Sequence, residues 1–432
     1  EIAETRGEIA DVELRLADAG VSSRQDLDEE VDALDKFLQL SRKALQVWST
    51  QRAFYAQLKS GKFVAWGHQD YGADLTGVRA MLDSHGVVQV WSLTGAFCAK
   101  LKSGKCVAWG HKDYGADLTK VQATLDSHGV DKVWSSGGAF CAKLKSGTCV
   151  AWGHEDYGAD ITPVQTMLDS HGVHQVWSSS CSFFAQLKSG KCVAWGNRDS
   201  GGDLKTVRAM LDSHGVDKVW STLYAFCAKL KSGKCVAWGH KYYGADLTTV
   251  QAKLDSQGID QVWSSGGAFC AKLKSGKCVA WGHKDYGGDL TAVQAMLDSQ
   301  GLDQVWSTHR AYFAQLNSGK CVAWGHKDWG ADLTTVQELL DSSHGVDQVW
   351  STQRAFCALL KSGTCVAWGD GEKGGDLTAV QTTLDRYGVD QVWSSARAFC
   401  AKLKTGKCVA WGDKAYGGDI SAAQAILDSR HE

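Results

Sequence analysis

The chain has 432 residues, with 46 Lys and Arg against 48 Asp and Glu, which gives a formal net charge of −2. A nearly neutral chain has no overall field that would draw it to nucleic acid or to a membrane surface. No run of about 18 apolar residues is present, so we expect no transmembrane helix. The charge is uneven, because residues 1–46 hold 12 acidic and 6 basic side chains and leave the remainder with a net positive charge.

Residues 1–46 are predicted to form two helices that make a helical hairpin. The first helix stops at Gly20, and Ser22 or Ser23 can cap the second. The second has the narrow apolar stripe of a coiled coil. We interpret the hairpin as a cap on the end of the array formed by residues 47–432, with a dimerisation or docking pair as the alternative. The apolar positions are Ile2, Ile9, Val12 and Leu16 in the first helix and Leu27, Val31, Leu34, Leu38 and Leu45 in the second.

Residues 47–432 are nine copies of one unit. The period is 43 residues, with a single step of 44 for which Ser343 is the extra residue. A fixed period of this size indicates a repeat architecture, in which each unit is completed by its neighbours. The Trp of Val-Trp-Ser recurs at 48, 91, 134, 177, 220, 263, 306, 350 and 393, and the Trp of Ala-Trp-Gly at 66, 109, 152, 195, 238, 281, 324, 368 and 411.

Each unit is predicted to contain a strand, a hairpin, a polar loop and a helix. In the copy at 89–131 the strand is Gln89–Leu93, and the hairpin pairs Ala96–Lys102 with Lys105–Trp109. Gly104 at the third loop position suits a type I turn with a bulge, where one residue needs a positive φ.

The predicted helix begins at Asp117 as its N-cap and ends at Gly129. Leu118, Val121 and Leu125 form one apolar face with helical spacing. The same Asp recurs at 74, 160, 203, 246, 289, 332, 376 and 419.

The three-residue turn fixes which hairpin side chains share a face. One face is bulky and the other is small, so neighbouring units can stack bulky face on small face. Each large apolar side chain buried in this way contributes roughly 1.5–3 kcal/mol. The bulky face holds Phe97, Ala99, Leu101, Val107 and Trp109, and the small face holds Cys98, Lys100, Cys106 and Ala108.

The motif at 137–153, Gly-Gly-Ala-Phe-Cys-Ala-Lys-Leu-Lys-Ser-Gly-Thr-Cys-Val-Ala-Trp-Gly, resembles the repeat of the regulator-of-chromosome-condensation-like (RCC1-like) β-propeller family. The resemblance covers about half of each unit. Three features depart from the family: its His in the Gly-Gly strand is absent, the period is shorter, and a helix stands where the family has a strand. The Tyr-Gly-Gly-Asp tail is similar to repeat arrays in predicted proteins of unicellular algae and bacteria, most of which lack assigned functions.

We therefore predict a β-rich (α+β) repeat protein: nine strand–hairpin–helix units stacked as an open superhelical or propeller-like RCC1-type array over 47–432, after an α-helical hairpin at 1–46. The open form is favoured because the chain leaves no spare strand for a shared blade. It is also favoured because bulky Tyr55 and Phe63 replace the Cys98 and Cys106 positions in the first unit, which suggests contact with the N-terminal helices instead of a ninth unit. A closed propeller is the alternative.

The 15 cysteines are interpreted as buried free thiols, with disulfide and metal binding as alternatives. Cys98 and Cys106 lie diagonally, roughly 7–8 Å apart at Cα, which is too far for an easy disulfide. Phe184 and Phe313 replace the first cysteine in two further units. The odd total favours a reducing intracellular compartment, namely cytoplasm, nucleus or organelle interior. Because the sequence begins at Glu1, we leave open that a targeting peptide has been removed.

Neither a metal nor a cofactor is predicted. The histidines in the Gly-His-Lys-Asp loop have no CxxC or HExxH spacing beside them, so we read them as hydrogen-bonded loop residues, and metal ligation is the weaker alternative. The two Trp columns are read as core, with a stacking groove for sugars or bases as the alternative. The loop histidines are His68, His111, His154, His240, His283 and His326, and a second set, His85, His128, His171, His214 and His344, ends the helices.

The lysines of the hairpin tips are the candidate partner-binding residues. Stacking would align them along one edge, opposite an acidic side formed by the loops and helices. We weigh solubility against a surface for an acidic protein or an anionic membrane face; nucleic acid is disfavoured, because no aromatics interleave with the lysines. They are Lys100, Lys102, Lys105, Lys229, Lys231, Lys234, Lys272, Lys274, Lys277, Lys402, Lys404 and Lys407.

No catalytic constellation is visible, because every candidate polar residue is repeated whereas an active site needs a singular arrangement. We therefore expect no enzyme but a protein-binding scaffold or structural subunit of a larger assembly, acting through the lysine edge and the N-terminal helices. The alternatives are an RCC1-like guanine-nucleotide exchange factor, on fold analogy alone, and a carbohydrate-binding lectin. The sequence leaves open the partner, the organelle, the oligomeric state and whether the chain is a fragment of a precursor.

Overall fold

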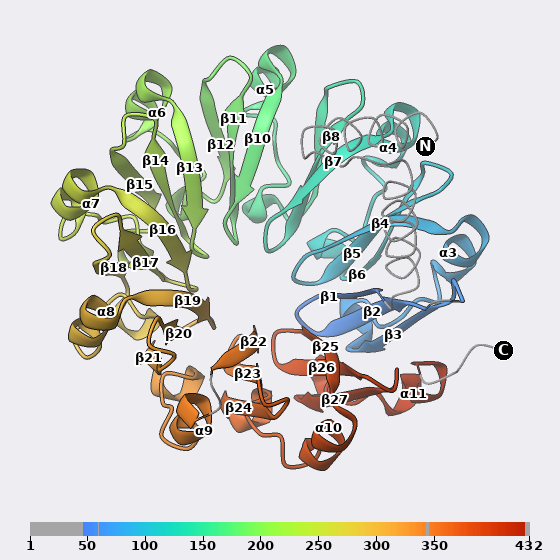
Figure 1. The fold of residues 1–432 in the computed structure, drawn as a ribbon. Coiled ribbons are helices and arrows are strands. Elements are labelled where there is room, and N and C mark those ends of the chain that lie inside the picture. The colour runs from blue at the N-terminus through green and yellow to red at the C-terminus, as the bar shows by residue number, and fades with distance from the viewer. Residues whose placement is uncertain (1–45, 59, 343–344, 428–432) are drawn as a thin grey trace, which may run out of the picture.

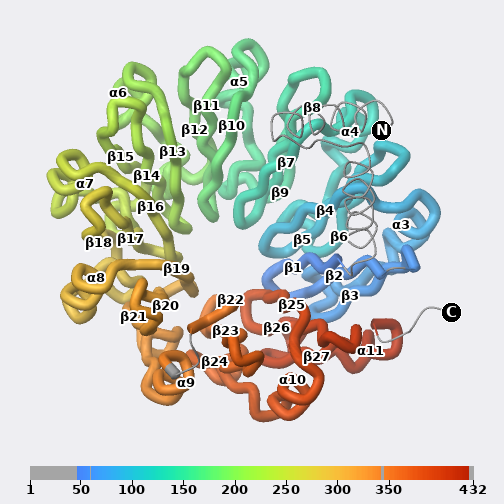
Figure 2. The backbone as a smooth tube through the Cα atoms, in the orientation of Figure 1, coloured from blue at the N-terminus to red at the C-terminus, as the bar shows by residue number. Residues whose placement is uncertain are grey.

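The computed structural model describes residues 46–58, 60–342 and 345–427. The chain forms nine units, each a three-stranded antiparallel sheet followed by a short 3₁₀ helix and an α-helix. Figures 1 and 2 show the nine sheets arranged around a centre, with the helices on the outside. The predicted helices of residues 1–46 and the extra residue Ser343 lie outside the described residues, apart from Gln46.

The first strand of each unit lies nearest the centre, because first strands of successive units contact one another. First strands are β1 (Gln46–Ser49), β4 (Val87–Ser92), β7 (Val130–Ser135), β10 (Val173–Ser178), β13 (Val216–Ser221), β16 (Ile259–Ser264), β19 (Leu302–Ser307), β22 (Val346–Ser351) and β25 (Val389–Ser394). Second strands are β2 (Ala53–Gln57), β5 (Ala96–Leu101), β8 (Ala139–Leu144), β11 (Ser182–Leu187), β14 (Ala225–Leu230), β17 (Ala268–Leu273), β20 (Ala311–Leu316), β23 (Ala355–Leu360) and β26 (Ala398–Leu403). Third strands are β3 (Phe63–Gly67), β6 (Cys106–Gly110), β9 (Cys149–Gly153), β12 (Cys192–Gly196), β15 (Cys235–Gly239), β18 (Cys278–Gly282), β21 (Cys321–Gly325), β24 (Cys365–Gly369) and β27 (Cys408–Gly412).

Each helix from the first unit to the eighth packs beside the third strand of its own unit, and the helix of the ninth unit packs beside the third strand of the first. The α-helices are α3 (Arg79–His85), α4 (Gln122–His128), α5 (Gln165–His171), α6 (Arg208–His214), α7 (Gln251–Gln257), α8 (Gln294–Gln300), α9 (Gln337–Ser342), α10 (Gln381–Tyr387) and α11 (Ser421–Leu427). The 3₁₀ helices are η1 (Gln69–Tyr71), η2 (Lys112–Tyr114), η3 (Glu155–Tyr157), η4 (Arg198–Ser200), η5 (Lys241–Tyr243), η6 (Lys284–Tyr286), η7 (Lys327–Trp329), η8 (Gly371–Lys373) and η9 (Lys414–Tyr416).

The predicted N-cap at Asp117 is wrong, because α4 begins only at Gln122. The Asp117 carboxylate instead accepts hydrogen bonds from the backbone N–H and the hydroxyl of Thr119, which close a turn before the helix. These bonds hold the pKa of Asp117 below its ordinary value. Short polar side chains compete for the backbone in this way, and they favour a turn as readily as a cap. The helix end at Gly129 is as predicted, with φ of 66°.

The hairpin has the predicted register. Phe97 pairs with Trp109, Cys98 with Ala108 and Ala99 with Val107. Gly104 in the turn has φ of 85°, in the left-handed region that glycine adopts without strain. The two faces of the hairpin therefore differ in bulk as the sequence indicates.

Neighbouring units pack bulky face on small face. Cys98 and Cys106 of the second unit lie in one buried cluster with Phe140 and Trp152 of the third, and Leu125 of α4 closes the outer side. Within the third unit, the Phe140 and Trp152 rings stack at 5.2 Å. Each unit is thus completed by the next one along the chain.

The ninth unit packs on the first in the same way. Phe54 and Trp66 share a buried cluster with Cys400, Cys408 and Leu427. Strand β1 contacts β25 as it contacts β4. The predicted nine-unit fold class is confirmed, and of its two forms the described contacts give the propeller-like one, in which first and last units meet (Figure 1).

Tyr55 does not indicate an open form, contrary to expectation. It faces the second unit, where its ring lies 4.8 Å from that of Trp109 and 5.8 Å from that of Phe97. Phe184 does the same against Trp238, at 4.8 Å. An aromatic in the small-face column is therefore a local packing variant that stands in place of a thiol, and it does not indicate which neighbour is present.

Within the described residues, no helix is both long enough and apolar enough to cross a bilayer.

Candidate functional site

A ring of loops surrounds the centre, where each first strand turns into the second. In these loops the backbone N–H of one unit donates to the carbonyl of the next, as from Gln51 to Thr94 at 2.9 Å. The junction between the ninth and the first unit has the same bond, because the N–H of Ala396 donates to the carbonyl of Gln51 at 3.0 Å. Eight such bonds link the loop positions Gln51, Thr94, Gly137, Ser180, Leu223, Gly266, His309, Gln353 and Ala396, with Thr94 and Gly137 the pair without one.

A column of serines adds a second set of bonds between units. The Ser178 hydroxyl donates to the Ser135 carbonyl at 2.7 Å, and the Ser49 hydroxyl donates to Ser394 across the first–last junction at 2.7 Å. Because these hydroxyls are used by the framework, they are poor candidates for ligand binding on their own.

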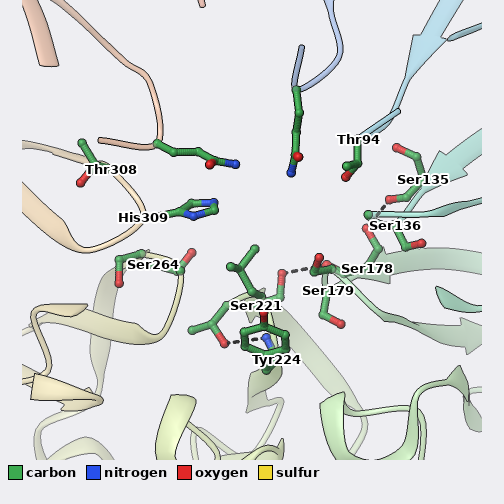
Figure 3. A pocket seen from close by; sticks show the side chains of 18 of the residues that line it. Thr94, Ser135, Ser136, Ser178, Ser179, Ser221, Tyr224, Ser264, Thr308 and His309 are labelled. Atoms are coloured by element: carbon green, nitrogen blue, oxygen red, sulfur yellow. Dashed lines mark hydrogen bonds between the residues drawn. The ribbon is translucent and has the colours of Figure 1, made fainter. Parts of the chain in front are cut away.

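The loops enclose a polar cavity of about 810 Å³ (Figure 3). This volume lies within the range typical of small-molecule sites. Tyr71, Tyr114 and Tyr157 also contribute to its wall, so the cavity continues to the 3₁₀ helices of the polar loops.

The wall of the cavity is uneven. Gln51, His309 and Gln353 bring amide and imidazole groups to it, whereas Gly137 and Gly266 bring no side chain. Figure 3 shows the His309 ring directed toward the cavity. Burial, reinforced by the positive charges of Arg310 and Arg354, lowers the pKa of His309 from 6.5 to about 4. The imidazole is therefore neutral near pH 7 and can both donate and accept a hydrogen bond.

The residue after each ring position divides the loops into two arcs. In units seven, eight, nine and one it is an arginine, and we call these four residues, Arg310, Arg354, Arg397 and Arg52, the arginine arc. In units two to six, which form the opposite arc, the same position holds Gly95, Gly138, Cys181, Tyr224 and Gly267.

The arginines stack on aromatic rings of the polar loops. The Arg310 guanidinium lies 4.8 Å from the Tyr286 ring centre and 4.6 Å from that of Trp329. Arg52 lies between Tyr416 and Tyr71, at 5.0 and 4.6 Å. On the opposite arc glycine leaves the space that the ring occupies, since a Cβ on Gly95 would lie 2.8 Å from the Tyr114 ring.

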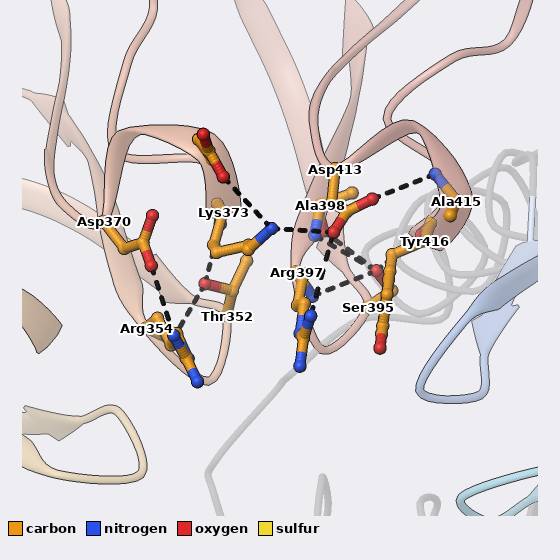
Figure 4. Close-up of polar contacts among 11 residues, drawn as sticks. Thr352, Arg354, Asp370, Lys373, Ser395, Arg397, Ala398, Asp413, Ala415 and Tyr416 are labelled. Carbon is orange, nitrogen blue, oxygen red and sulfur yellow. Dashed lines mark hydrogen bonds and ion pairs between the residues drawn. The ribbon is translucent and has the colours of Figure 1, made fainter.

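Two arginines of the arc have acidic partners (Figure 4). Arg354 lies 3.4 Å from Asp370, and Arg397 lies 3.9 Å from Asp413. Asp413 also pairs with Lys373 of the preceding unit at 2.9 Å and thereby raises the pKa of that lysine. In the described part of the chain, neither Arg52 nor Arg310 makes an ion pair, and the Nε of Arg310 is buried without a hydrogen-bond partner.

The predicted lysines fall into two groups. The four strand lysines are half-buried and are used internally: Lys100 and Lys272 donate to the carbonyls of Val130 and Leu302, while Lys229 and Lys402 pair with acids. Their acidic partners are Asp217 at 2.7 Å and Asp390 at 2.6 Å. The other eight, which we call the tip lysines, are exposed and make no ion pair with the described residues: Lys102, Lys105, Lys231, Lys234, Lys274, Lys277, Lys404 and Lys407.

The tips lie at the periphery, away from the arginine arc. The Lys102 N–H donates to the carbonyl of Gly86, at the end of α3, and the helices form the outer side of the molecule (Figure 1). The sequence thus brings two basic surfaces to opposite ends of the first strands, and only the tips were predicted.

The other repeated residues serve the framework. The Trp of Ala-Trp-Gly is buried in all nine units, so this column offers no free stacking surface. In every unit but the first its indole N–H donates to the preceding unit, as from Trp109 to Gly72 at 3.2 Å. His111 begins the 3₁₀ helix η2 and stacks beside Tyr114, with the ring centres 4.9 Å apart. Within the described ranges, no three His, Cys, Asp or Glu side chains are arranged to hold a metal ion.

The cysteines are packing groups. Fourteen of the fifteen are buried, and Cys181 is half-buried. Burial raises the pKa of Cys192 and Cys235 to about 12, which keeps these thiols neutral. Interaction with the Cys106 thiol, together with burial, raises the pKa of the Cys98 thiol.

The arginine arc was missed, although it has a sequence signal. The pair before the second strand is Gly-Gly in the third and sixth units, but Gln-Arg, His-Arg or Ala-Arg in the arc. Departures confined to consecutive units point to a local role that the repeat itself does not need.

No protein-family model matches the chain. No curated protein matches its sequence. Among solved structures, the chain is similar to yeast RCC1 (Prp20) in its complex with Kap60, at 14% identity and a TM-score of 0.42, over 83% of this chain and 88% of that one. It is also similar to the ectodomain of the receptor kinase CR4 from Physcomitrella patens, at 16% identity and 0.39, over 66% and 73%. The ectodomain of the Arabidopsis thaliana receptor kinase ACR4 gives 14% and 0.37, over 65% and 97%.

Proposed function

We propose that the chain is a non-catalytic scaffold that binds protein partners through its tip lysines, as a subunit of a larger assembly. The observation that carries the proposal is the contrast between the two lysine groups. The strand lysines are held by internal contacts, whereas the tip lysines are exposed at the periphery without acidic partners among the described residues.

A repeated row of unpaired ammonium groups is suited to an acidic protein surface. Complementary charge speeds encounter and fixes the register of two partners, although each exposed pair adds little affinity. The lysine-bearing tip recurs from unit to unit, with Thr148, Asn317 and Thr364 replacing one of its lysines in three units, so a partner with several acidic groups can contact more than one unit.

Two further features support the family kinship and the cellular compartment that we propose. The Gly-Gly–to–Trp-Gly motif relates the units to RCC1-like repeats, and we infer a distant kinship with that family from it. Buried thiols with a raised pKa are compatible with a reducing intracellular compartment, which is where we place the protein.

The test is lysine-directed cross-linking with mass spectrometry in an extract of the native source. We expect links between proteins at the tip lysines, and their loss, with loss of the co-purifying partner, in the variant Lys102→Glu/Lys105→Glu/Lys231→Glu/Lys234→Glu. The matched control is Lys112→Glu/Lys284→Glu, which changes exposed lysines of the polar loops. Purification as a lone chain, or equal loss of the partner in the control, would contradict the proposal.

A further inference from the structure

The arginine arc is the feature of the molecule that the repeat does not explain. The packing of units, the loop hydrogen bonds and the serine column occur in both arcs of the described residues, and the one loop pair without a bond, Thr94 and Gly137, lies where glycine follows. Four arginines in consecutive units therefore add charge to the loop surface without a framework role that all units share.

The arc holds more positive charge than its acids neutralise. Four arginines and Lys373 face three acids, namely Asp370, Asp413 and Glu372. The unpaired members are Arg52 and Arg310. Each guanidinium lies 4.6–5.0 Å from the centres of two aromatic rings. Stacking of this kind positions a guanidinium whose N–H groups can still donate to a ligand.

Fixed guanidinium groups match carboxylates. Two parallel N–H groups of an arginine bind both oxygens of a carboxylate, and stacking reduces the side-chain entropy that binding would otherwise cost. Arg354 and Arg397 are already about one-third exposed beside acids of their own loops, with exposed side-chain fractions of 34% and 31%. A ligand carboxylate would join an existing network of charges instead of a bare surface.

The neighbouring cavity wall indicates a peptide over a small inorganic anion. Gln51, His309 and Gln353 directly precede Arg52, Arg310 and Arg354 and line the axial cavity. Amide side chains and a neutral imidazole pair with the N–H and C=O groups of a peptide backbone. In these three units a cation stands one residue after a wall position, so charge and polar wall recur together from unit to unit.

We propose that the arginine arc, with Gln51, His309 and Gln353 beside it, is a binding site for an acidic linear peptide segment of a partner protein. The carboxylates of the segment pair with Arg310 and Arg52, and its backbone contacts the polar cavity wall. This surface is separate from the tip lysines, so the proposal stands whether or not the tips bind a partner.

The test is fluorescence anisotropy of a fluorescein-labelled peptide of alternating Glu and Gly with the full chain, against a Gln–Gly peptide of equal length. We expect binding of the Glu peptide only, weakened by salt. In Arg52→Gln/Arg310→Gln the affinity should fall at least about tenfold, since two charge-assisted pairs are lost. The matched control, Lys112→Gln/Lys284→Gln, removes the same charge from exposed polar-loop positions of the opposite arc and should change affinity less than about twofold.

A second variant separates charge from stacking. Arg52→Lys/Arg310→Lys keeps the charge and loses the planar fork, so its affinity should lie between those of the wild type and the glutamine variant. Circular dichroism confirms that each variant is folded. The proposal is overturned if the Glu peptide does not bind, if the polar-loop control loses as much affinity as the arc variant, or if only phosphate or phosphatidylserine vesicles bind.

Discussion

The two arcs of the molecule share one framework and differ in the side chains that stand on it. On the opposite arc, at Gly138, the polar-loop tyrosines lie against bare backbone. On the arginine arc the same rings hold guanidinium groups, and this arc includes the junction between the last unit and the first. The stacking of units is therefore separable from the chemistry of the loops, so the repeat supplies the shape while single substitutions supply a local surface.

The largest expected effect tests whether the framework is the same at the first–last junction. Phe54 is fully buried against the ninth unit, as Phe140 is against the second. Phe54→Ala and Phe140→Ala should each lower the free energy of unfolding by about 3–5 kcal/mol, because each leaves a cavity. Urea denaturation measures both. A loss of under about 1 kcal/mol for Phe54→Ala alone would show that the junction is open.

The second effect is confined to the arginine arc and depends on pH. His309 has its pKa lowered to about 4, so between about pH 6.5 and 4 the unfolded chain binds a proton that the folded chain does not. Stability should therefore fall as the pH decreases through this window, by up to about 3 kcal/mol from this group.

The charged groups facing His309 are Arg310 and Arg354, and its ring stacks on Trp329 at 6.4 Å. In His309→Gln the difference between urea midpoints at about pH 7.5 and about pH 4.5 should shrink relative to the wild type. The control is His128→Gln, on an exposed helix end of the opposite arc. An equal change in both variants would contradict the assignment.

The third effect concerns a hydrogen bond that the described framework has at Trp109 but not at Trp66. Trp109 donates its indole N–H to Gly72, but the buried indole N–H of Trp66, at the first–last junction, has no partner among the described residues. Trp109→Phe should cost about 1–3 kcal/mol, since it leaves a buried carbonyl unpaired. Trp66→Phe should cost less in the same urea experiment, because no bond is lost. Equal costs would mean that the junction bond forms in solution.

The smallest effect uses two buried tyrosines of the arginine-arc units. The Tyr312 hydroxyl donates to the Ala268 carbonyl at 2.7 Å, whereas the Tyr55 hydroxyl is buried without a partner among the described residues. Tyr312→Phe should lower stability by about 1 kcal/mol, and Tyr55→Phe should leave it unchanged or raise it. Thermal denaturation of the pair checks the sign, and a loss in Tyr55→Phe would show an unseen partner.

The sequence predicts the unit well, because its signals are local. The Lys-Ser-Gly turn sets the register, and the register sets the faces that hold Phe97 and Cys98. The helix start was misplaced because an Asp two residues before a Thr suits a turn as well as a cap. Each of these features is determined by interactions between residues that are close in the sequence.

The arrangement of units was beyond the same reasoning. Whether unit nine meets unit one depends on the angle between neighbours, which no single residue reports, and Tyr55 pointed to the wrong answer because its contact is with the second unit. The loop bonds such as Ala396 to Gln51 use backbone atoms and leave no mark in the sequence. The site was missed because a strong repeat pattern hides residues such as Arg310, which depart from it.

Each three-stranded sheet is built from one continuous stretch of chain, and the junction between unit nine and unit one uses the same kinds of contact as the others. No sheet of the described residues takes a strand from the other end of the array. The junction between units nine and one therefore does not depend on strand exchange. New termini cut into a polar loop such as that around Asp113, with the old ends joined by a linker, should yield the same assembly.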